Sequence, residues 1–89
     1  MQKNTATEVP KDWHRADVVA ALKRNGWTVR ALSRRHKLSE YTLYTALDRP
    51  YPKGERIIAE ALGLNVQDIW PEREAKRHFQ PSIKYVSTA

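Results

Sequence analysis

The sequence predicts an all-α domain built from five short helices. Apolar residues recur at the three- and four-residue spacing of a helix in successive segments, and no segment requires a strand to explain it. Glycine, proline or a residue that favours a helix cap separates neighbouring segments. With 89 residues, the chain is long enough for one small domain with a modest core.

The first helix is expected over residues 13–25. Asp12 can cap its N-terminus, and Val18 and Leu22 fall on the side that would be buried. Gly26 follows the last expected turn and suits the left-handed conformation that commonly ends a helix.

The second and third helices are expected over residues 29–36 and about 40–48. Thr28 and Ser39 offer hydroxyl groups that can cap them, and the segment 37–39 interrupts the helical pattern. Positions three, four and seven apart share one side of a helix, so the third helix has two distinct stripes. The apolar stripe contains Leu43, Ala46 and Leu47, and the polar stripe contains Tyr41, Tyr44, Thr45 and Asp48.

The fourth helix is expected over residues 52–62, and a short fifth helix over residues 66–70. Pro52 suits the first helical position, and Gly63 provides the stop. Asn65 can cap the fifth helix.

The rest of the chain is expected to form tails. Residues 1–11 are predicted to be disordered, residues 12–73 to form the domain, and residues 74–89 to be a flexible C-terminal tail. The N-terminus lacks the apolar stretch of a secretory signal, no apolar run approaches a membrane span, and there is no cysteine. A cytoplasmic location is therefore expected.

Positive charge is concentrated in the middle of the chain. Residues 28–53 contain six Lys or Arg against two Asp or Glu, a net charge of +4, whereas residues 54–70 have a net charge of −2. Such a segment attracts nucleic acid, anionic membranes or acidic proteins, or only improves solubility. Charge alone does not choose among these.

The segment from about residue 28 to residue 48 has the pattern of a helix-turn-helix. Ser33 is small where two helices would cross, and Leu38 would fill the turn. Such a pair can place the N-terminal half of its second helix in the major groove of DNA. Lys37 stands where glycine is common, so an altered or strained turn is expected there. An ordinary helical hairpin with a solvated charged face is the alternative.

Two groups of residues are the candidate DNA contacts. The polar start of the third helix would present side chains to base edges, and the flanking hydroxyl and basic residues would lie near phosphates. The base-reading candidates are Glu40, Tyr41, Tyr44 and Thr45. The phosphate candidates are Thr28, Arg34, Arg35, Lys37, Ser39, Arg49 and Lys53.

Several motifs together resemble the Ner family, small repressors of Mu-like transposable phages with bacterial Ner-like (Nlp) relatives. They include Trp-His-Arg-Ala-Asp at residues 13–17, Pro-Lys-Gly-Glu at residues 52–55 and Ile-Trp-Pro at residues 69–71. The resemblance implies a lambda-repressor-like fold, sequence-specific duplex DNA binding, repression of early phage or prophage transcription in a bacterial host, and no catalysis. It ends near Arg73, and Lys37 departs from the family's usual glycine.

Other residue patterns have competing interpretations. Trp13, Trp27 and Trp70 could stack on single-stranded nucleic acid, but their places at helix ends favour packing. His14 and Asp17 lie three apart, but two ligands do not make a metal site. No convincing nucleophile, acid–base set or metal cluster is present, so we expect neither an enzyme nor a cofactor.

Two other functions compete with duplex DNA binding. A small basic adaptor or antitoxin-like module would bind an acidic protein, and an RNA-binding protein would prefer looped single strands. One helix reads few base pairs, so a DNA regulator of this size is expected to act as a weak homodimer or as paired monomers on DNA.

Overall fold

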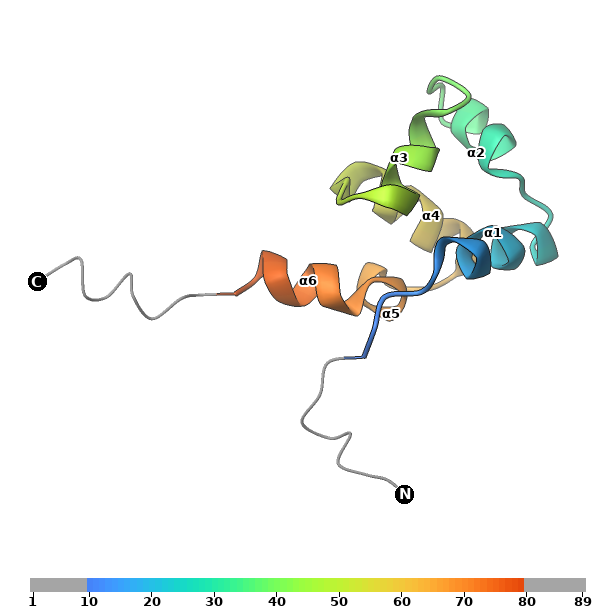
Figure 1. The fold of residues 1–89 in the computed structure, drawn as a ribbon. Helices are drawn as coiled ribbons and strands as arrows, with labels where there is room; N and C mark the ends of the chain where they lie inside the picture. The colour runs from blue at the N-terminus through green and yellow to red at the C-terminus, as the bar shows by residue number, and fades with distance from the viewer. Residues whose placement is uncertain (1–9, 80–89) are drawn as a thin grey trace, which may run out of the picture.

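The computed structural model describes residues 10–79, and these residues contain six helices (Figure 1). Their bounds are α1 Arg15–Arg24, α2 Val29–Arg35, α3 Thr42–Asp48, α4 Pro52–Leu62, α5 Val66–Ile69 and α6 Pro71–Arg77. The all-α prediction is confirmed, with one helix more than expected. None of these helices is long and apolar enough to cross a membrane.

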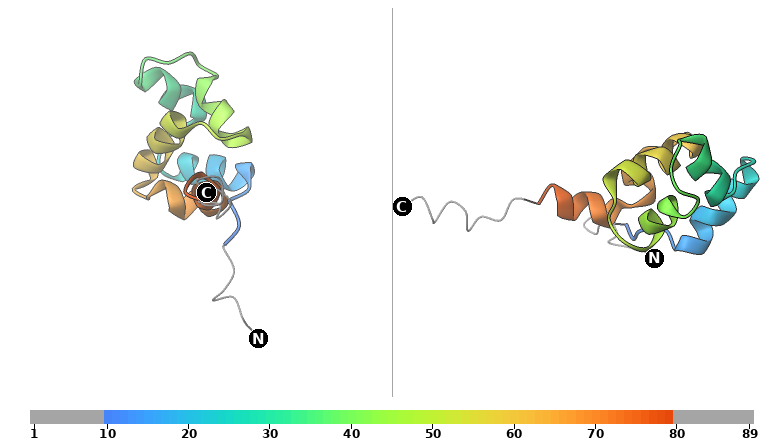
Figure 2. Two further views of the ribbon diagram at one scale, coloured as in Figure 1. Left: turned by 90° about the vertical axis from the view of Figure 1, so that its left-hand side faces the viewer. Right: turned by 90° about the horizontal axis from the view of Figure 1, so that it is seen from above.

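Helices α1 to α5 enclose one core, and α6 projects from their body, as the view from above in Figure 2 shows. Helix α3 packs against α2, α4 and α1, and α4 also contacts α1 and α5. The core takes its largest fully buried apolar side chains from all five helices and from the residue that follows α5. They are Val18, Leu22, Leu32, Leu43, Ile58, Ile69 and Trp70.

The start of α1 differs from the expectation. His14, not Asp12, caps the helix, because its Nδ1 accepts a hydrogen bond from the N–H of Ala16 at 3.0 Å. The Asp12 carboxylate instead accepts the N–H of Glu72 at 2.7 Å, and the Asp12 N–H donates to Glu72 Oε1 at 3.0 Å. Asp12 therefore caps α6, a partner that is 60 residues away in the chain.

The turn after α2 explains how the chain manages without glycine at residue 37. Lys37 has φ 59°, the left-handed conformation that glycine adopts without cost. The Lys37 N–H donates to the Arg34 carbonyl and the Leu38 N–H to the Ser33 carbonyl, each at 2.9 Å. These two hydrogen bonds form the Schellman pattern that commonly ends a helix. The predicted strain is therefore present in the backbone of Lys37, although the turn itself is of a common type.

The start of α3 also differs from the expectation. The helix begins at Thr42, and Tyr41, with no side-chain cap, precedes it, so Glu40 and Ser39 lie in the turn. Ser39 contributes its carbonyl, which accepts the N–H of Thr42 at 3.0 Å, and not the predicted hydroxyl cap.

The remaining helix ends follow the sequence. Thr28 caps α2 by accepting the N–H of Ala31 at 3.0 Å. Pro52 begins α4, and Gly63, with φ 71°, ends it. The carboxylate of Asp68 accepts the N–H of Asn65 at 2.8 Å at the start of α5.

Helix α6 corrects the prediction that a flexible tail begins at residue 74. Residues 74–77 are helical, and the side chains of Glu74 and Arg77 are 22% and 28% exposed. The helix has no buried apolar stripe, so the periodicity that reveals the other helices is absent. Residues 1–9 and 80–89, where the other predicted tail segments fall, lie outside the described residues.

Candidate nucleic-acid interface

The interface begins with the contact that fixes α3 against α2. Ser33 is fully buried, and its Oγ accepts the N–H of Leu43 at 3.3 Å. That N–H belongs to the first turn of α3, where backbone donors have no partner within the helix. Ser33 was predicted only as a small residue at the crossing, but its hydroxyl also joins the two helices.

The polar stripe of α3 remains at the surface. The side chain of Tyr41 is 61% exposed, and Tyr44 and Thr45 are half-buried. The Tyr41 and Tyr44 rings stack, with centroids 6.0 Å apart and an angle of 29° between their planes. These residues thus present aromatic faces and a hydroxyl group next to one another.

Glu40 lies beside the same tyrosines, but its carboxylate already has partners. Oε1 accepts a hydrogen bond from Arg30 at 3.0 Å, and Oε2 accepts one from Arg34 at 3.2 Å. The hydrogen bond from Arg30 and the charge of its guanidinium lower the pKa of Glu40. The same hydrogen bond and the negative charge of the Glu40 carboxylate raise the pKa of Arg30. Glu40 is therefore ionised at neutral pH, and both of its oxygen atoms are engaged by α2.

Arg30 is a residue that the sequence interpretation missed. Its guanidinium lies 5.8 Å from the centroid of the Tyr41 ring, close enough for a cation–π interaction. It stands four residues before Arg34 on α2, and that spacing could have identified it as a neighbour on the same face.

A shallow hollow groups some of the predicted residues. It is lined by Thr28, Arg34 and Tyr44, together with two basic residues that were not predicted, Lys23 and Arg30. We call the surface formed by Lys23, Thr28, Arg30, Arg34, Glu40, Tyr41 and Tyr44 the α2–α3 face. It combines exposed cations, aromatic rings and one carboxylate, a set of side chains able to contact phosphates and base edges.

Other phosphate candidates lie apart from this hollow. Three of them line separate hollows. Arg35 lies in one with Trp27, Lys53 in another with Arg56, and Arg49 in a third with Lys76. Arg35, Lys37, Ser39, Arg49 and Lys53 are all exposed, and the four basic residues among them form no ion pair within residues 10–79. They are spread over several parts of the surface and are not gathered at one point.

The tryptophans follow the packing interpretation. Trp70 is 1% exposed in the core, and Trp13 and Trp27 pack against the core while half-buried. His14 is occupied as a helix cap, and within residues 10–79 no three His, Asp or Glu side chains lie close enough together to hold a metal ion.

Comparison with known proteins identifies the family. Residues 12–84 match the family described as winged helix-turn-helix DNA-binding. The chain is 45% identical to the Mu-like prophage FluMu DNA-binding protein Ner of Haemophilus influenzae, over 93% of this chain and 90% of that protein. The chain belongs to the Ner family.

Two further Ner relatives agree with this assignment. The negative regulator of transcription of Escherichia phage D108 is 54% identical over 71% of this chain and 86% of its own length. The solution structure of the Mu Ner protein is 52% identical and superposes with a TM-score of 0.63, over 70% of this chain and 84% of that one. The Ner resemblance and the helix-turn-helix fold are thus confirmed. The family description mentions a wing, but all regular secondary structure in residues 10–79 is helical.

Proposed function

We propose that this Ner family member is a sequence-specific duplex DNA-binding regulator that represses early phage or prophage transcription. One observation carries the proposal: the buried contact between Ser33 and Leu43 fixes α3 on α2 and leaves its polar stripe at the surface beside exposed cations. The names of its relatives, a DNA-binding protein and a negative regulator of transcription, support the same function. The protein would act in the bacterial cytoplasm, without a cofactor or a catalytic step.

In this proposal, α3 enters the major groove and Tyr41, Tyr44 and Thr45 contact base edges. Glu40 remains a base-reading candidate, but a base that donates to its carboxylate would share it with Arg30 and Arg34. In the free protein, Glu40 therefore offsets part of the positive charge that the two arginines present. On DNA, phosphates compete for these arginines, because phosphate accepts the same paired hydrogen bonds as a carboxylate.

The proposed phosphate contacts extend beyond the α2–α3 face. They are the predicted Thr28, Arg34, Arg35, Lys37, Ser39, Arg49 and Lys53, with Lys23 and Arg30 added from the geometry. Such contacts set the orientation of the protein and supply affinity, while α3 supplies sequence preference. Two copies on an approximately two-fold site would provide the selectivity that one short helix lacks.

The test is selection of bound duplexes from a random pool, followed by anisotropy titrations of the selected duplex and of a scrambled one. We expect one enriched sequence, and a log–log salt dependence of roughly −0.9 for each phosphate neutralised. A pool that shows no enrichment, or binding that ignores salt, would contradict the proposal and favour a protein-binding module. Equal or better binding to looped RNA would contradict the choice of duplex DNA.

A further inference from the structure

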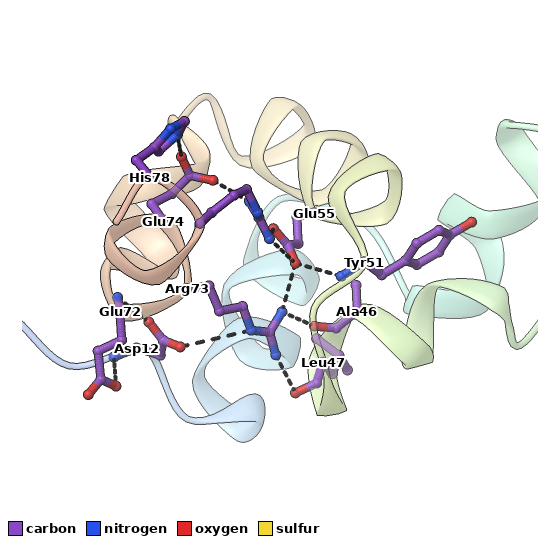
Figure 3. Close-up of polar contacts among 10 residues, drawn as sticks. Asp12, Ala46, Leu47, Tyr51, Glu55, Glu72, Arg73, Glu74 and His78 are labelled. Atoms are coloured by element: carbon purple, nitrogen blue, oxygen red, sulfur yellow. Dashed lines mark hydrogen bonds and ion pairs between the residues drawn. The ribbon is translucent and has the colours of Figure 1, made fainter. Parts of the chain in front are cut away.

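We propose that Arg73, held by buried Glu55, is a positioning residue that sets the angle at which α3 meets DNA. This inference rests on the proposed function, since it concerns the same helix. The contacts lie at the C-terminal end of α3, on the side where α6 joins the domain (Figure 3). They connect α3, the loop after it, α4 and α6.

Glu55 is the centre of these contacts. It lies in the first turn of α4, and its side chain is 0% exposed. Its carboxylate accepts the N–H of Tyr51 at 2.7 Å, Arg73 Nη1 at 3.2 Å and Arg77 Nη2 at 3.1 Å. A buried carboxylate is costly unless it is fully partnered, so Glu55 holds both arginines in place. We call Glu55, Arg73 and Arg77 the Glu55 cluster.

Arg73 connects the Glu55 cluster to α3. Its Nη1 donates to the Ala46 carbonyl at 2.6 Å, and its Nη2 lies 3.5 Å from the Leu47 carbonyl. Its guanidinium also lies 5.0 Å from the centroid of the Trp70 ring, and its side chain is only 12% exposed. The guanidinium is therefore fixed from several sides while it binds the end of α3.

The sequence explains why α3 needs this donor. A helical carbonyl normally accepts the N–H four residues later, and for Ala46 that residue is Pro50, which has none. For Leu47 it is Tyr51, whose N–H is bound to Glu55 instead. The last two core residues of α3 thus lack their usual partners, and Arg73 supplies both.

Helix α3 is consequently held by buried contacts at both ends. Ser33 binds the N–H of Leu43 in its first turn, and Arg73 binds the carbonyls of its last turn. The pair between Arg15 and Asp48 also lies at the C-terminal end, but both side chains are about half exposed and such pairs contribute little. Without Arg73, only apolar packing and the exposed Arg15–Asp48 pair would hold the last turn of α3, so that turn would shift and the base contacts would move.

The decisive variants change Arg73 and Glu55 with little change in size. Arg73→Lys keeps the charge and removes the forked donors, and Glu55→Gln keeps the shape and removes the charge. The matched controls are Arg24→Lys and Glu60→Gln, at exposed positions without an ion pair among residues 10–79. Arg77→Lys is a milder third variant in case the first two do not fold.

Each variant of the full chain is titrated with the duplex selected by the parent protein and with a scrambled duplex. The temperature is one at which circular dichroism shows the variant to be folded. We expect Arg73→Lys to lower the ratio of the two affinities about tenfold, the selectivity of one base contact. Its affinity for the scrambled duplex should change by less than about twofold, because the charge is kept. Glu55→Gln and Arg77→Lys should act in the same direction, and the two controls should not change the ratio.

A second readout is independent of DNA. In the free protein, the amide NMR signals of residues 42–48 should shift in Arg73→Lys, while those of residues 17–22 in α1 should stay in place. Three results would overturn the inference. Folded Arg73→Lys could keep the parent ratio of affinities for the selected and scrambled duplexes, bind both duplexes more weakly by the same factor, or leave the amide signals of α3 unmoved. If the parent protein enriches no duplex, the proposed function fails, and the α3 signals alone then decide whether Arg73 positions this helix.

Discussion

Replacing Glu40 with Gln tests the electrostatics of the α2–α3 face directly. Gln keeps the size of the side chain and removes the charge that binds Arg30 and Arg34. In the parent protein, one carboxylate offsets one of these two guanidinium charges. The substitution therefore adds up to one net positive charge at the surface that we propose faces DNA.

The expected size of the effect follows from counterion release. One more neutralised phosphate makes the log–log salt slope more negative by about 0.9, which over a fourfold change in salt is about 3.5-fold in affinity. The gain in affinity of Glu40→Gln over the parent should thus be about 3.5-fold larger at 50 mM than at 200 mM salt. Anisotropy titrations with a scrambled duplex measure both values.

The same titrations on the selected duplex separate two roles of Glu40. If Glu40 only restrains the arginines, both duplexes gain equally and selectivity is unchanged. If Glu40 also reads a base, the selected duplex gains less than the scrambled one. Lower affinity for the scrambled duplex, or a gain that is the same at both salt concentrations, would refute the reasoning.

The structure also predicts how the difference in DNA affinity between the parent protein and Glu40→Gln depends on pH. Because Arg30 holds the pKa of Glu40 below its usual value of 4.5, the carboxylate stays ionised as the pH falls from 7 to 5. The effect of Glu40 is lost only when the pH falls through this lowered pKa. The affinity difference between parent and Glu40→Gln should therefore be constant between pH 7 and pH 5, and a difference that disappears by pH 5 would contradict the ion pairs.

Three further predictions concern the turn, the Glu55 cluster and the assembly on DNA. Lys37→Gly should raise the free energy of unfolding by about 1 kcal/mol, because Lys37 occupies the left-handed region, and should raise the melting temperature by about 4–8 °C. Lys37→Ala keeps the strained conformation, so it should leave the melting temperature unchanged. Equal melting temperatures for Lys37→Gly and Lys37→Ala would contradict this explanation. Arg77→Ala should cost about 1.5–3 kcal/mol in urea unfolding, because it removes a charged partner from buried Glu55. The exposed neighbour variant Lys76→Ala should stay within about 0.5 kcal/mol, and an Arg77 effect no larger than that would contradict a stabilising contact between Arg77 and Glu55. On DNA with two half-sites, moving one by five base pairs should abolish cooperative binding, because it rotates that site by about half a helical turn. Cooperativity that ignores this rotation would contradict the paired arrangement.

The fold was predictable where local chemistry decides it. Thr28 and Asn65 stand at helix starts and Gly63 at a helix end, and apolar periodicity placed the core of each of the first four helices. These signals act between residues within one or two turns, so they can be recognised in the sequence alone.

The errors occur where distant residues decide the structure. Asp12 caps α6 and not α1, because the N-terminal segment lies against the end of α5, where the Trp13 N–H binds the Ile69 carbonyl at 2.9 Å. Helix α6 is held by ion pairs to Glu55 across the domain, so it needs no apolar stripe. Pro71 at its start and charges suited to its dipole were the only local signs of it.

The candidate site was predicted in outline and not in its electrostatics. The sequence placed Tyr41, Tyr44 and Arg34 near one another, and the structure does the same. It could not reveal that Glu40 binds Arg30 and Arg34, since that depends on the angle at which the turn brings α3 to α2. The individual DNA contacts of these residues remain predictions.

The central claim is that α3 reads the base sequence, and repeating the duplex selection with substituted proteins tests it most directly. The two variants are Thr45→Ala and Arg49→Ala. Thr45 lies on the polar stripe of α3, and Arg49 is a phosphate candidate just after this helix. We expect Thr45→Ala to relax or change the preferred base at one position of each half-site, with a loss of discrimination of about 1–3 kcal/mol there. Arg49→Ala should return the parent sequence with weaker binding overall. Selection of the parent sequence by Thr45→Ala, or a changed sequence with Arg49→Ala, would contradict the claim that α3 is the recognition helix.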